Sequence, residues 1–76
     1  MKIIRTIRHS DSRFVVGKVL DGGAYRYVLF RDGREMAPLP TEFADIVSDI
    51  AYSGNDADSV AADTFENLIR SNYFSN

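Results

Sequence analysis

The chain has 76 residues, of which 45% are hydrophobic and 26% charged, with a formal net charge of -2 and no cysteine. This length predicts one domain, residues 1–76, that buries only about 60% of its unfolded surface and has no room for a separate substrate domain. The lack of cysteine excludes disulfides and zinc–thiolate sites, and the apolar runs are far shorter than the roughly 20 residues of a membrane span, which predicts a soluble cytoplasmic protein.

Residues 1–37 predict an antiparallel β meander. Three runs rich in β-branched or aromatic residues (KIIRTI, RFVVGKVL and AYRYVLF) are separated by the polar stretches HSDS and DGG. Asp32-Gly33 is a strong hairpin signal, because its two-residue turn needs positive φ at both positions. The chain then returns through REMA as a short edge strand, which Pro38 and Pro40 end because proline has no N–H to donate.

The second half predicts two helices, residues 41–53 and 56–72. Apolar residues at helical spacing form one face of the first helix: Phe43, Ile46, Val47 and Ile50. A similar stripe marks the second helix: Ala61, Phe65, Leu68 and Ile69. The expected fold is α+β, a small antiparallel meander of three to four strands followed by two helices packed on one face.

Charge divides the chain into two unlike halves. Residues 1–36 carry eight basic and four acidic side chains, a charge of +4, whereas residues 37–76 carry one basic and seven acidic side chains, a charge of -6. Such asymmetry bears on the choice of partners. On the helices it predicts an acidic face that could meet a basic protein or nucleoprotein complex, formed by Glu42, Asp45, Asp49, Tyr52, Asp56, Asp63 and Glu66. A solvated face that only aids solubility is the alternative.

The stretch SGNDADSVAAD, residues 53–63, fails as a calcium loop. Counted from Asp56, position 5 is Val60, position 6 is Ala61 and position 12 is Asn67, where calcium loops need an oxygen ligand, glycine and glutamate. The better interpretation is that Asn55, Asp56 or Asp58 caps the second helix, where the positive end of the helix dipole favours a carboxylate.

The strand AYRYVLF carries large side chains on both faces. Tyr25, Tyr27 and Arg31 share one face by parity, and Arg26 lies on the other. Arginines beside aromatic rings are typical of sheets that stack single-stranded bases, so Tyr25, Tyr27, Arg26 and Arg31 are the residues of an alternative nucleic-acid-binding hypothesis. Tyrosines that cover a small core while keeping the hydroxyl in water explain the same pattern.

No catalytic residue, metal ligand or cofactor site is predicted. The residues His9, Ser10 and Asp11 are consecutive in a turn and therefore cannot converge as a catalytic triad. The glycines fit neither a dinucleotide fingerprint nor a phosphate-binding loop. Gly17, inside a strand, predicts a bulge or a close approach of another group.

A very short chain without enzyme motifs, with a small sheet, helices and an acidic face, resembles the small phage-encoded inhibitors of the anti-CRISPR type. That resemblance implies a non-enzymatic protein that blocks a host nucleoprotein complex in the host cytoplasm. The favoured function is therefore a protein-binding module, with a single-stranded nucleic-acid binder as the alternative. A homodimer that pairs its basic sheet with its acidic helices, or joins free strand edges, is a third hypothesis.

Overall fold

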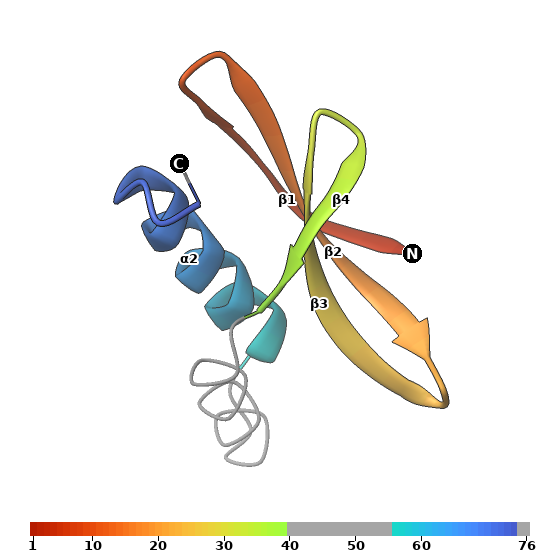
Figure 1. The fold of residues 1–76 in the computed structure, drawn as a ribbon. Helices are drawn as coiled ribbons and strands as arrows, with labels where there is room; N and C mark the ends of the chain where they lie inside the picture. The colour runs from red at the N-terminus through yellow and green to blue at the C-terminus, as the bar shows by residue number, and fades with distance from the viewer. Residues whose placement is uncertain (40–55, 75–76) are drawn as a thin grey trace.

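The computed structural model describes residues 1–39 and 56–74, which form a small α+β fold (Figure 1). One antiparallel sheet has the strand order β1-β2-β3-β4. A single helix, α2, lies against one face of this sheet (Figure 1). The bounds of the elements are β1 Lys2–His9, β2 Ser12–Asp21, β3 Ala24–Arg31, β4 Arg34–Pro38 and α2 Ala57–Arg70.

Each pair of consecutive strands is joined by a two-residue turn with positive φ at both positions. The φ values are 49° and 62° at Ser10-Asp11, 60° and 84° at Gly22-Gly23, and 50° and 86° at Asp32-Gly33. This is the backbone geometry whose twist matches that of the flanking strands, which is why aspartate and glycine dominate these positions. The hairpin predicted at Asp32-Gly33 is confirmed.

The helix α2 is terminated at both ends by local hydrogen bonds. Asp56 is the N-cap, and its carboxylate accepts bonds from the backbone N–H groups of Asp58 and Ser59. At the other end Asn72 has a φ of 62°, and the N–H of Tyr73 donates to the carbonyl of Leu68 at 2.9 Å. Together with the bond from Asn72 N–H to Ile69 these contacts form a Schellman motif, which satisfies carbonyls at the helix end.

The core lies between the helix and the sheet face that it covers. Phe65 and Leu29 are fully buried in it, as is Val16. The predicted helical stripe is confirmed at Ala61, Phe65 and Ile69, which are buried, whereas Leu68 is only half-buried. The other buried members of this cluster are Ile7, Phe14 and Leu39.

The predicted arrangement of two helices on one face is wrong. In the residues that the structure describes, the four-stranded sheet is followed by one helix, α2. The first predicted helix, 41–53, lies outside the described residues, together with Phe43, Ile46, Val47 and Ile50. An apolar spacing shows which side of a helix would be apolar, but whether so short a helix forms depends on its packing partners.

In residues 1–39 and 56–74 the one helix is neither long nor apolar enough to cross a membrane.

Replacing Phe65 with alanine should destabilise the fold by roughly 3–5 kcal/mol, because the ring is fully buried at the centre of the core. In a domain of this size that loss approaches the whole free energy of unfolding. The matched control is Leu20→Ala, since Leu20 is 64% exposed and its loss should change stability by less than about 0.5 kcal/mol. Thermal melting followed by circular dichroism measures both, and equal melting temperatures would contradict this account of the core.

Candidate functional site

Asp58, in the first turn of α2, accepts hydrogen bonds from three side chains of the sheet. Its Oδ1 accepts from the Tyr27 hydroxyl at 2.5 Å and from Lys18 Nζ at 3.1 Å. Its Oδ2 accepts from Lys2 Nζ at 3.2 Å. The carboxylate thus ties the start of α2 to strands β1, β2 and β3.

This environment favours the charged form of Asp58. The Tyr27 hydroxyl bond, with smaller contributions from Lys18 and Lys2, outweighs burial and lowers the pKa of Asp58 to about 2. Burial, reinforced by the bond to Asp58, raises the pKa of the Tyr27 hydroxyl well above its usual value. Tyr27 is therefore a neutral hydrogen-bond donor at physiological pH.

Further along α2, the carboxylates of Asp63 and Glu66 both bind Arg5 of β1. Its Nη1 lies 2.6 Å from Asp63 Oδ1 and 3.1 Å from Glu66 Oε1. The hydrogen bond to Asp63 is the main cause that raises the pKa of Arg5. Glu66 also pairs with Arg70, four residues later on the same helix, at 3.0 Å. The basic strands and the acidic helix thus neutralise each other across this interface.

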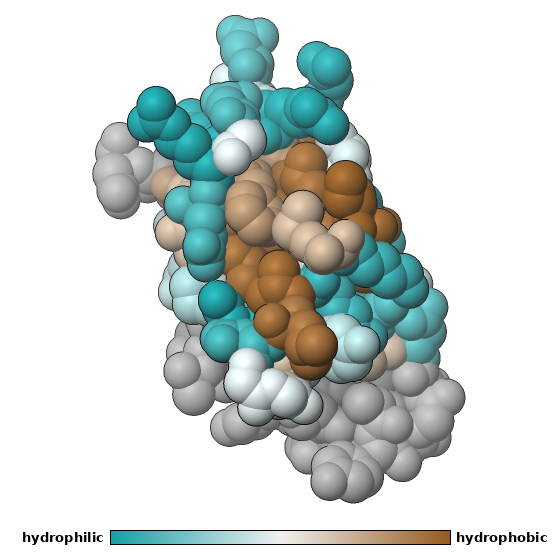
Figure 2. Space-filling model, turned by 90° about the vertical axis from the view of Figure 1, so that its right-hand side faces the viewer, coloured by the Kyte–Doolittle hydropathy of each residue, from teal (hydrophilic) through white to brown (hydrophobic). Residues whose placement is uncertain are grey.

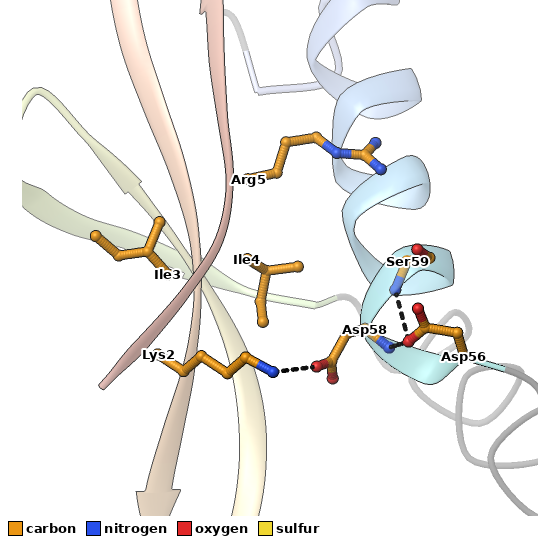
Figure 3. A pocket seen from close by; sticks show the side chains of 7 residues that line it. All are labelled: Lys2, Ile3, Ile4, Arg5, Asp56, Asp58 and Ser59. Carbon is orange, nitrogen blue, oxygen red and sulfur yellow. Dashed lines mark hydrogen bonds and ion pairs between the residues drawn. The ribbon is translucent and has the colours of Figure 1, made fainter.

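A small hollow of about 220 Å³ opens between β1 and the N-terminus of α2 (Figure 3). Figure 3 shows Lys2 and Arg5 pointing from β1 towards the helix. Asp56 and Asp58, on the other wall, are already occupied by the helix N–H groups and by Lys2. The hollow is therefore lined mainly by groups that satisfy each other, which makes it a weak site for a charged ligand.

The residues of the predicted acidic face are only partly described. Glu42, Asp45, Asp49 and Tyr52 lie outside the described residues. Asp56 caps α2, and Asp63 and Glu66 bind Arg5. The side chain of Asp63 keeps 64% of its surface exposed, whereas that of Glu66 keeps 29%.

The four residues of the nucleic-acid hypothesis do not form one surface. Tyr27 lies on the helix-covered face and donates to Asp58, while Tyr25 is 66% exposed at the start of β3. Arg31 donates to the Ser12 hydroxyl at 3.1 Å and lies over the ring of Phe14. Arg26 is on the opposite face, where it pairs with Asp21 and Glu35.

The sheet face opposite α2, here called the open face, carries apolar side chains in water. Met1 and Ile3 are 71% and 57% exposed, and Val15 and Phe30 are half-buried. Figure 2 looks at this face and shows a brown apolar band framed by teal polar groups. We call Met1, Ile3, Val15 and Phe30 the apolar stripe; together with Arg13 and Gly33 they line a hollow of about 260 Å³.

Gly17 of β2 lies on the open face beside the apolar stripe. A Cβ atom at Gly17 would lie 2.6 Å from Met1 Sδ and 3.1 Å from Phe30 Cε2. The glycine therefore lets both side chains lie close to the backbone of β2, which is the close approach that the sequence predicts. The bulge is on the neighbouring strand, where the register shifts between Ile3 and Arg5.

The described ranges 1–39 and 56–74 hold no cluster of three or more side chains that could bind a metal ion. His9 contacts the side-chain oxygen of Asn72 at 3.4 Å. Its neighbours Ser10 and Asp11 form the β1–β2 turn.

Comparisons with protein-family models, with curated proteins and with solved structures find no match to this chain.

Sequence reasoning missed Asp58 as the centre of the helix–sheet interface and missed the apolar stripe. The signal for the first was present in the charge split, because a basic sheet and an acidic helix in one chain can pair with each other. The signal for the apolar stripe was the alternation in β2, which places Val15, Gly17 and Val19 on the side opposite Phe14 and Val16.

The Asp58→Asn variant should lose a pH-dependent part of the stability. Because folding lowers the pKa of Asp58 from 3.8 to about 2, its carboxylate stabilises the fold above pH 3.8, and this contribution disappears as the pH falls towards 2. After allowance for solvent screening we expect roughly 1–2 kcal/mol at pH 7.

Urea denaturation of the parent and Asp58→Asn at pH 7 and at pH 2 measures this effect. The two should differ at pH 7 and converge at pH 2. Asp21→Asn is the control, since Asp21 is exposed and pairs only with Arg26 among the described residues. A parent–variant difference that stays constant between these pH values would contradict the role of the charge.

Proposed function

We propose that this chain is a non-catalytic protein-binding module that meets its partner through the open face of its sheet. The observation that carries the proposal is the apolar stripe, which places Met1 and Ile3 in water beside Val15 and Phe30. Contiguous exposed apolar surface on a small domain is typical of interaction sites. A cytoplasmic location, as the sequence predicts, is part of the proposal.

The pattern of the strands supports this function. A sheet with one face on a core usually presents polar side chains on the other face. Here Ile3, Val15 and Phe30 come from three different strands and meet on the side away from α2. Three strands converging on one apolar patch indicate a surface rather than isolated exposed residues, which are common and need no explanation.

The acidic helical face has weaker support as the partner site. The carboxylates of Asp63 and Glu66 already bind Arg5, so a basic partner would have to compete with an intramolecular arginine. An inhibitory role, and the resemblance to phage-encoded inhibitors, remain predictions, because the comparisons lend them no support.

The two other hypotheses also have less support than protein binding by the open face. Single-strand stacking requires several aromatic rings on one surface, whereas Tyr27 is engaged by Asp58 and Tyr25 lies on the face opposite Phe30. Dimerisation through strand edges is opposed by a bulge in β1 and by both a bulge and Pro38 in β4.

Site-specific photocrosslinking tests the proposal in cells that carry the gene. We expect p-benzoylphenylalanine at position 3 to form a discrete protein adduct, because this position lies on the apolar stripe. The matched control is the same residue at position 20, since Leu20 is similarly exposed but lies on the other side of the sheet. Circular dichroism verifies that both variants are folded.

No adduct from position 3, or the same adducts from both positions, would refute the open face as a protein-binding surface.

A further inference from the structure

The open face carries a pair of arginines whose charge no carboxylate of the described residues balances. Arg8 and Arg13 are directly opposite each other in the register of β1 and β2, and both are exposed. They point away from α2, because the preceding pair, Ile7 and Phe14, is buried in the core beneath the helix. Like charges directly opposite on neighbouring strands destabilise a sheet.

The other charges of this face are already paired. Arg26 binds Asp21 at 3.0 Å and Glu35 at 3.7 Å. Neither Arg8 nor Arg13 forms an ion pair with a carboxylate in residues 1–39 or 56–74. Asp32, on the adjacent turn, accepts from the backbone N–H of Arg13 at 3.0 Å instead of its guanidinium. Both guanidinium groups are therefore left without an ion-pair partner among the described residues.

The arginine pair is continuous with the apolar stripe. Arg13 lines the same hollow as Ile3, Val15 and Phe30, so one bound segment can contact the guanidinium and the apolar stripe together. A carboxylate is the group that a guanidinium binds with two parallel hydrogen bonds. The hollow, at about 260 Å³, accommodates one bulky apolar side chain.

We infer that the open face binds an acidic segment of a partner protein, with an apolar side chain of that segment on the stripe and its carboxylates on Arg8 and Arg13. This inference rests on the proposed function and adds the chemistry of the partner. It also accounts for the opposed arginines, since a bound carboxylate removes their mutual repulsion.

Two other occupants fit this face less well. A single-stranded nucleic acid would use the arginines, but within residues 1–39 and 56–74 it would find only Phe30 as an aromatic ring on the open face. Among the described residues, the carboxylates that a second copy would present on α2, those of Asp58, Asp63 and Glu66, are already bound. Both occupants are outcomes that the experiment below distinguishes.

The test selects short random peptides displayed on yeast for binding to the full chain. We expect the selected peptides to combine Asp or Glu with a large apolar residue. Arg13→Glu should weaken their binding by about tenfold or more, because the reversal places like charge against like charge. It should also raise the melting temperature, since it puts a carboxylate opposite Arg8. Loss of binding then cannot be attributed to unfolding.

The matched control is Arg34→Glu. Arg34 is also exposed and also opposes another arginine, Arg31, but this pair belongs to the face that α2 covers. The substitution changes the net charge by the same amount, and binding should stay within about twofold of the parent if the charge acts locally.

The outcomes separate the inference from the proposed function. If Ile3→Ser abolishes peptide binding while Arg13→Glu leaves it unchanged, the acidic partner is refuted and the protein-binding face stands. If no peptide is selected, or if binding is insensitive to Ile3→Ser, the proposed function itself is refuted. Tight binding of labelled oligo(dT) that Arg13→Glu abolishes, or a dimer in light scattering that Ile3→Ser dissociates, would replace the partner protein by a nucleic acid or a second copy.

Discussion

The rest of the described fold depends on how α2 is held on one face of the sheet. Phe65 packs against Leu29 and Val16, and burial of a side chain of this kind contributes roughly 1.5–3 kcal/mol. The ion pairs around it are partly exposed, so each contributes at most about 1 kcal/mol. Packing therefore supplies most of the stability. The bonds from the strands to Asp58, and from Arg5 of β1 to Asp63 and Glu66 of α2, fix the direction and position of the helix axis across the sheet.

This interface changes the meaning of the charge split in the sequence. A basic half and an acidic half in one chain are compatible with a basic external partner, an acidic one, or pairing of the two halves with each other. Among the described residues, the third possibility applies to Lys2, Lys18 and Arg5 of the sheet, which pair with carboxylates of α2. What remains is the pair Arg8 and Arg13, which has no ion-pair partner among the described residues, on strands whose lysines and other arginine are paired. Net charge could not reveal that pair, because it sums over both faces of the sheet.

The sheet could be predicted from sequence because its signals are local. Asp32-Gly33 and Gly22-Gly23 need only their own backbone angles to specify a turn, and the alternation in the strands then fixes the pairing. The side on which the helix packs is not local. Strand β3 presents large side chains on both faces, so parity separates Tyr27 from Phe30 without telling which of them meets a helix. The predicted fold class with two helices was wrong for a related reason, since the apolar spacing in residues 41–53 alone does not show that a packing partner exists.

The edges of the sheet decide how a partner can approach. An edge strand invites pairing through its free N–H and C=O groups, and natural sheets discourage this with bulges, prolines and charges. β4 is short, has a register shift between Leu29 and Phe30 in its ladder with β3, and ends at Pro38, which has no N–H to donate. β1 is longer, but its ladder shifts between Ile3 and Arg5, and Arg5 and Arg8 place charge along it. With both edges discouraged and one face covered by α2, the open face is the surface of the described residues that we propose for contact with another protein.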